Sequence, residues 1–268
     1  MSFLTKYRAN SQLLLTLGLM ISGLLILPNP AKAVTIAPLT SQDANPGFDD
    51  TDFNLLLDQG DFKELFVAEA RIGNNGFGGN GERELGINRD VRATVNPGQP
   101  VAKADLVWGN GKVWDFSLEY TGSKVTYKVF DANQTFQLMT QEFSGAVTDI
   151  FIRTFANKGS GSNLQNAVSL TNLVLNGTAL GSLASASTNT TKDLDYLHLT
   201  GLSAPFTLTG KTAFSWVGAA PARSNLAFQI KVGTSQSVPE PSTLAAIFLA
   251  TMTGAATLKR QKIAAQKV

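Results

Sequence analysis

The sequence has no cysteine, and His198 is its only histidine. Without cysteine the chain cannot form disulfides, act as a thiol enzyme or hold a metal through thiolates. A lone imidazole also excludes a site in which several histidines of one chain bind a metal. The folded part must therefore be stabilised by an ordinary hydrophobic core.

Neither end of the chain carries an apolar run as long as the roughly 20 residues of a typical membrane span. At the N-terminus, Lys6 and Arg8 precede a shorter run over residues 13–27, and Ala31 and Ala33 flank Lys32 beyond it. This order predicts a secretory signal peptide over residues 1–33, cleaved after Ala33, because signal peptidase requires small side chains at those two positions. An uncleaved N-terminal membrane anchor is the alternative.

The C-terminus carries the second apolar run, over residues 244–258, after Pro239-Glu240-Pro241 and before four basic residues. As a helix it would reach about 22 Å at roughly 1.5 Å per residue, against about 30 Å of hydrocarbon. The basic end is expected to stay cytoplasmic and leave Pro-Glu-Pro on the far side. An amphipathic helix that closes the domain is less favoured, because the charges follow the run instead of alternating with it at helical spacing.

These three parts, in this order, resemble the PEP-CTERM sorting signal. "VPEPST" matches its Pro-Glu-Pro box, residues 243–258 its transmembrane helix and "KRQK" its basic end, so that the signal covers residues 237–262. In that family a membrane peptidase, the exosortase, cuts near the box and passes the protein to the cell surface. The resemblance implies that Pro239, Glu240 and Pro241 are recognition residues for another enzyme.

The body left after both cuts is mildly acidic. Removing the ends takes away seven basic residues and Glu240, which leaves 15 basic and 19 acidic side chains. A net charge near −4 argues against nucleic acid as a partner, since binding phosphates needs clustered positive charge.

Short runs with period-two alternation dominate the body from residue 100 onward. In "VWDFSLEY", residues 113–120, Trp114, Phe116, Leu118 and Tyr120 share one face, as in a half-buried strand. Residues 101–108, 113–120 and 124–130 are expected to form a hairpin-linked meander, its first turn at Asn110-Gly111. Further strands are expected over residues 147–155, 168–175, 195–202, 206–210, 213–218 and 225–233.

We therefore predict an all-β fold, an antiparallel β-sandwich or jelly roll over residues 61–236, flanked by the signal-peptide helix and the short transmembrane helix. Residues 34–60 form an acidic N-terminal segment. Residues 49–71 could hold one short helix or an edge strand. The Ser/Thr/Ala-rich residues 182–192 are expected to be an exposed loop.

The body resembles the choice-of-anchor extracellular domains, of the W type. The motifs that carry the resemblance are "ELFVAEARIG", "ELGINRD", "TDIFIRT", "LVLNGTALG" and "RSNLAFQIKVG". The family is named for how its members are anchored, so the resemblance implies an anchored surface domain and no site residues.

Two motifs are weak signals for catalysis. Gly76, Gly78 and Gly81 satisfy G-x-G-x-x-G, but no helix or alternating strand–helix unit follows, so a loop is favoured over dinucleotide binding. His198 has Asp193 and Asp195 close by in sequence. A Ser-His-Asp triad is conceivable, but G-x-S-x-G is absent and a structural histidine is favoured.

Other residues suggest binding. An acidic cluster could hold calcium, although the EF-hand spacing is missing and a solvated linker is the simpler interpretation. An aromatic row could stack on sugar rings if exposed, or form core if it faces inward. The cluster comprises Asp43, Asp49, Asp50, Asp52, Asp58 and Asp61, the row comprises Trp108, Trp114, Tyr120 and Tyr127, and glycosylation sequons stand at Asn133, Asn176 and Asn189.

The sequence therefore favours an exported protein without enzymatic activity, catalytic residues or cofactor. It would be held in the membrane by its C-terminal helix, then sorted to the cell surface or extracellular matrix, with signal peptidase and exosortase as processing partners. A carbohydrate-binding module for exopolysaccharide is the alternative, and a secreted hydrolase with paired carboxylates is the third possibility.

Overall fold

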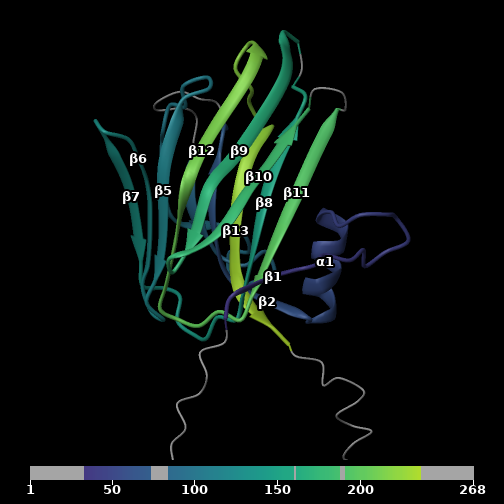
Figure 1. Ribbon diagram of the computed structural model, residues 1–268, viewed down its shortest axis with the longest axis vertical. Helices are drawn as coiled ribbons and strands as arrows, with labels where there is room; N and C mark the ends of the chain where they lie inside the picture. The colour runs from purple at the N-terminus through teal and green to yellow at the C-terminus, as the bar shows by residue number, and fades with distance from the viewer. Residues whose placement is uncertain (1–32, 74–83, 160, 188–190, 237–268) are drawn as a thin grey trace, which may run out of the picture. The chain divides into compact units, whose positions relative to one another are not determined.

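The computed structural model describes residues 33–73, 84–159, 161–187 and 191–236. In this part of the chain two antiparallel sheets pack face to face, and one helix lies on the outer side of one of them (Figure 1). The seven-stranded sheet has the order β1-β11-β8-β13-β2-β3-β4, and the six-stranded sheet the order β10-β9-β12-β5-β6-β7. The predicted antiparallel β-sandwich is thus confirmed.

The elements of the seven-stranded sheet come from both halves of the chain. They are β1 (Thr35–Ala37), β2 (Phe62–Arg71), β3 (Leu85–Asn88), β4 (Pro100–Ala104), β8 (Asp149–Asn157), β11 (Lys192–Thr200) and β13 (Leu226–Ser235). The six-stranded sheet contains β5 (Val113–Tyr120), β6 (Val125–Phe130), β7 (Thr135–Thr140), β9 (Asn163–Leu175), β10 (Thr178–Ala186) and β12 (Phe206–Gly218).

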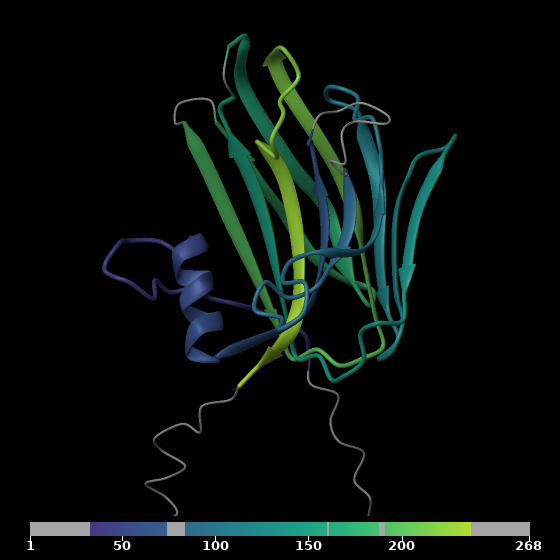
Figure 2. The ribbon, with the colours of Figure 1, turned by 180° about the vertical axis from the view of Figure 1, so that it is seen from behind.

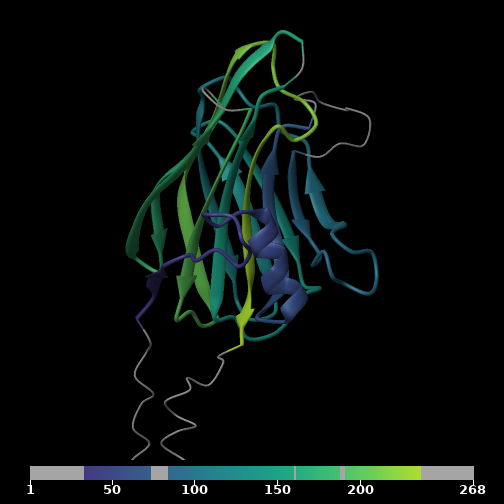
Figure 3. The same ribbon diagram turned by 90° about the vertical axis from the view of Figure 1, so that its right-hand side faces the viewer.

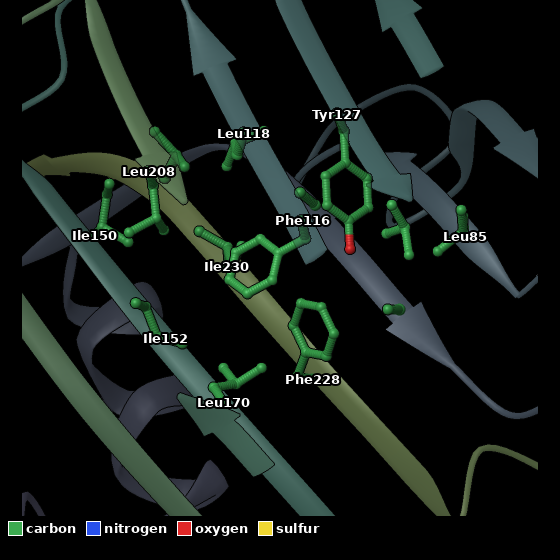
Figure 4. Packing of buried hydrophobic residues seen from close by; sticks show 14 of the residues in the cluster. Leu85, Phe116, Leu118, Tyr127, Ile150, Ile152, Leu170, Leu208, Phe228 and Ile230 are labelled. Carbon is green, nitrogen blue, oxygen red and sulfur yellow. The ribbon is translucent and has the colours of Figure 1, made fainter. Parts of the chain in front are cut away.

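Inward-facing apolar side chains of both sheets form the main core. Phe116 and Leu118 of β5 meet Phe228 and Ile230 of β13 from the opposite sheet (Figure 4). All four are almost completely buried. The alternation along β5 is confirmed, because Trp114 is buried in this core while its neighbour Val113 is 54% exposed.

The predicted meander is only partly correct. β5, β6 and β7 pair in succession, but the residues before β5 belong to the other sheet, where β4 pairs with β3. Asn110 and Gly111 do form a turn, and it carries the chain from one sheet to the other instead of closing a hairpin. The reason is packing: the Trp108 ring is buried between the sheets, 4.5 Å from the Phe214 ring.

Three further expectations need correction. Residues 206–210 and 213–218 form one continuous strand, β12, which pairs with β5 on one side and β9 on the other. Most of residues 182–192 is not a loop, because residues up to 186 complete β10 and Lys192 begins β11. β1, β3 and β7 were not foreseen, since short strands at or near a sheet edge carry little alternation.

The ambiguous segment over residues 49–71 contains both a helix and a strand. α1 (Asp50–Gln59) is followed by β2, which lies inside the sheet between β13 and β3 and is not an edge strand. α1 lies on the outer face of the seven-stranded sheet (Figure 3). Its Phe53 and Leu57 pack with Phe62, Phe151 and Tyr196 of that face. Since β1 also pairs with β11, the acidic segment is integrated with the sandwich.

Among the described residues, no helix has the length and apolar character needed to cross a membrane. The predicted helices over residues 1–33 and 243–258 lie outside the described residues, apart from Ala33.

The absence of a side chain at Gly210 makes room for the core. A Cβ atom there would lie 2.8 Å from Phe116 Cε1 and 2.9 Å from Leu173 Cδ2. We expect Gly210→Val to lower the free energy of unfolding by about 1–3 kcal/mol, because the added bulk must displace both side chains. Ala213→Val, on the same strand with its side chain on the opposite face, is the matched control. Equal midpoints of thermal unfolding for the two variants would contradict this packing.

Candidate functional site

The most organised polar site joins His198 of β11 to Asp149 at the start of β8. His198 Nε2 lies 2.8 Å from Asp149 Oδ1, and the imidazole stacks on the Phe151 ring at 3.9 Å between centroids. Thr148 Oγ1 and the Ser235 amide donate to the second carboxylate oxygen, Oδ2. Asp149 thus binds the side chain of His198 from β11, the hydroxyl of the preceding residue Thr148 and the backbone amide of the last residue of β13.

Electrostatics fix the roles within this pair. Burial opposes ionisation of Asp149, but the hydrogen bonds from His198, Thr148 and Ser235 outweigh it and hold the pKa of the carboxyl below its usual value. An ionised Asp149 can only accept hydrogen bonds, so His198 Nε2 carries a proton and donates it.

Two cavities adjoin the pair. They are lined by residues from the end of the sandwich where β1 begins and β13 ends, and Figure 2 shows that these two strand ends lie on the same side. The larger, of about 590 Å³, is lined by Asp149, Thr200 and residues at both ends of the described fold, among them Ala33 and Gln236. The smaller, of about 260 Å³, lies beneath the N-terminal segment and is lined by apolar and polar side chains in equal number, with His198 and Asp61 among the polar ones.

The triad considered from the sequence is not assembled. Asp195 accepts from the Ser185 hydroxyl at 3.0 Å, and Asp193 accepts from the Ala186 amide, so neither acid contacts His198. No serine hydroxyl of the described residues hydrogen-bonds to His198. Asp149, the actual partner, was missed, because 49 residues separate the two in sequence and only the pairing of β8 with β11 joins them.

The acidic cluster organises the N-terminal segment. The Asp52 carboxylate is buried and accepts from the backbone amides of Gln42, Asp43 and Asp49. Asp49 in turn caps α1 by accepting from the amides of Thr51 and Asp52, which completes a capping box. The solvated-linker interpretation is therefore wrong for these residues.

The remaining acids of the cluster do not converge on one point. Asp50 makes two hydrogen bonds to the Arg153 guanidinium, at 2.7 and 2.6 Å, and accepts from the Tyr196 hydroxyl. Asp58 pairs with Arg92 at the surface. Within the described ranges no three His, Cys, Asp or Glu side chains lie together in a way that could hold a metal ion.

The aromatic row faces inward. Trp108, Trp114, Tyr120 and Tyr127 are each no more than 1% exposed, so they are core and cannot stack on a sugar. Trp108 Nε1 donates to the Arg71 carbonyl and Tyr120 donates to the carbonyls of Gly122 and Gly145. Among the described residues the Tyr127 hydroxyl has no hydrogen-bond partner, and its burial, together with the negative charge of Glu69, raises its pKa well above the usual value.

Small and hydroxyl side chains line one part of the outer face of the six-stranded sheet. A shallow cavity of about 310 Å³ lies over β9, β10 and β12, and its walls include Ala167, Ser169, Ala184, Ala213 and Ser215. No aromatic ring is among its lining residues.

Several residues singled out from the sequence lie outside the described residues. These are Gly76, Gly78 and Gly81 of the glycine motif, the sequon at Asn189, and the processing residues Ala31, Pro239, Glu240 and Pro241. Ala33 and the sequons at Asn133 and Asn176 are exposed, and Asn176 forms a tight turn between β9 and β10.

No protein-family model matches this chain, and no curated protein sequence matches it.

The depressed pKa of Asp149 predicts acid sensitivity. A carboxyl whose pKa is lower in the folded than in the unfolded chain stabilises the fold above the unfolded value of about 3.9, and this stability is lost as the pH falls through the folded value. In Asp149→Asn the decline of the melting temperature between pH 5 and pH 2.5, to be measured by circular dichroism, is therefore expected to be shallower. Asp115→Asn, at an exposed carboxylate beside Lys211, serves as control and should keep the wild-type profile.

Loss of the Asp52 carboxylate is expected to loosen the N-terminal segment. Asp52→Ala leaves three backbone amides without their acceptor and should cost about 2–4 kcal/mol of unfolding free energy. Asp58→Ala removes only a surface ion pair, which is worth about 0–1 kcal/mol. Urea unfolding compares the two, and equal midpoints would show that Asp52 does not hold the segment.

Proposed function

We propose that this protein is an exported cell-surface or extracellular-matrix protein with a non-catalytic structural or binding role, sorted by an exosortase-type system. Its precursor is held in the membrane by residues 243–258 until the tail is cut near Pro239, Glu240 and Pro241. The N-terminal leader is removed after Ala33.

One observation supports this proposal: all strands of the described sandwich lie between the two expected cuts. β1 begins two residues after Ala33, and β13 ends four residues before Pro239. Within the described residues, each strand of the two sheets pairs with strands that lie between these points, and none of these pairings uses a residue beyond either cut.

The way the last strand ends supports a removable tail. β13 lies inside the seven-stranded sheet between β8 and β2, and its end is held by backbone hydrogen bonds. The Ser235 amide donates to Asp149, and the Gln236 amide donates to the Asp61 carbonyl. The fold is therefore secured immediately before the stretch that the peptidase would cut.

The first and last described residues lie at the same end of the sandwich. Ala33 and Gln236 line one cavity, and in Figures 1 and 2 β13 (yellow-green) ends on the side where β1 (purple) begins. A body tethered there would present its opposite end and both outer sheet faces away from the membrane. A polysaccharide ligand has less support, because the aromatic row that would stack on sugars is buried.

The test is the intact mass of the full-length protein expressed in a host that has an exosortase, measured separately for membrane, surface and medium. We expect a mass spanning residue 34 to near Pro241 at the surface or in the medium. Substitution of Pro239, Glu240 and Pro241 by alanine should leave the tail on and move the protein to the membrane fraction, whereas Gln266→Ala should behave as wild type. A wild-type mass that retains residues 244–268 in the membrane would instead indicate a permanent C-terminal anchor.

A further inference from the structure

Glu64 of β2 and Lys231 of β13 form a pair that is buried beneath α1. The Glu64 side chain is fully buried and that of Lys231 is 9% exposed, and Lys231 Nζ lies 3.7 Å from Glu64 Oε2. The two residues are diagonal neighbours, because Glu64 is opposite Gly233 and Lys231 lies two residues before Gly233 on β13. The Lys63 carbonyl and the Phe62 ring occupy the volume that a side chain at Gly233 would need, so the side chain that faces Glu64 on β13 is that of Lys231.

This pair has poor geometry for a salt bridge. Charge-assisted N–H···O bonds are about 2.7–2.9 Å long, and within the described residues neither Glu64 oxygen accepts a hydrogen bond. The Val91 amide and the Lys231 ammonium are both close, but neither is placed to donate. Two buried charges without hydrogen bonds are costly, because the desolvation of both ions is not repaid.

The surroundings favour the protonated form of the Glu64 carboxyl. Burial raises the pKa of the Glu64 carboxyl, and the negative charge of Asp90 adds to this effect against the opposing attraction of Lys231. Transfer of one proton within the pair gives a carboxylic acid and a free amine, the forms that can react with each other. The Phe53 ring of α1 covers Lys231 on the other side, with its centroid 4.4 Å from Nζ.

We propose that Glu64 and Lys231 condense into an intramolecular amide that links β2 covalently to β13. Lys231 Nζ adds to Cδ of Glu64, one C–O bond of the carboxyl breaks, and the oxygen leaves as water with the two protons that the amine and the acid supply. No electrons are transferred, so the step needs neither an oxidant nor a cofactor. The product replaces two buried charges by one neutral amide.

The proposed amide would keep β13, the last strand of the fold, from separating from its sheet. β13 pairs with β8 and β2, and its backbone hydrogen bonds can be broken one after another from its free end. A covalent bond at Lys231, four residues before the end of β13, would stop such peeling near its start.

The experiment is intact-mass spectrometry of the denatured full-length protein, followed by tryptic peptide mapping. We expect the wild type to be lighter than its sequence by the mass of one water molecule. We also expect a branched peptide that joins residues 64–71 to a segment in which Lys231 is uncleaved, because trypsin does not cut after an acylated lysine.

Two variants control for folding and chemistry. Lys231→Arg keeps the charge and most of the packing but cannot condense, so it should show the unmodified mass. Glu64→Gln keeps the shape and should form the same amide by losing ammonia, which gives a product of the same mass as the linked wild type. A wild type of unmodified mass in which trypsin cuts after Lys231, while circular dichroism shows the folded β-spectrum, would overturn the proposal.

Discussion

Each strand of the sandwich must bury one face against the opposite sheet, and the aromatic side chains on those faces decide where the strands can lie. Trp108, Trp114 and Phe214 meet edge to face at one side of this inner layer. Because the Trp108 ring is enclosed there, the chain before β5 must cross between the sheets. Gly210 belongs to the same constraint, since the Phe116 ring occupies the volume that a side chain at this position would need.

Three carboxylates fix peripheral segments to the sandwich by binding backbone amides or neighbouring side chains. Asp52 gathers three amides of the N-terminal segment, Asp50 fixes α1 to Arg153, and Asp149 holds His198 and the last residue of β13. In each case the sandwich gains a fixed segment at its periphery. Because these carboxylates already bind backbone amides or side chains of the fold, the described acids of the cluster do not converge on a common point where they could bind a metal ion.

In our proposal β13 connects the C-terminal end of the fold to the Glu64–Lys231 pair beneath α1. β13 is the last strand, lies inside its sheet and is held at Ser235 by Asp149. A tail anchored in a membrane would transmit any pull directly to this strand. An amide between Lys231 and Glu64 would keep β13 attached to β2 under such a pull. Neither residue lies in a segment that would be removed, so the amide would act both before and after the proposed cuts.

The sequence by itself determined which residues share a face of a strand, the exclusion of disulfide and thiol chemistry, and the all-β class. It does so because alternation at period two is a local property that each strand carries alone, as in residues 113–120. It could not tell whether the row of Trp114 and Tyr120 faces core or solvent, since both orientations have the same period. Only the tertiary structure decided that β5 pairs with β12, that His198 meets Asp149, and that Glu64 lies beside Lys231. Those partners are far apart in the chain, and the choice among them depends on the volume of the side chains packed between the two sheets.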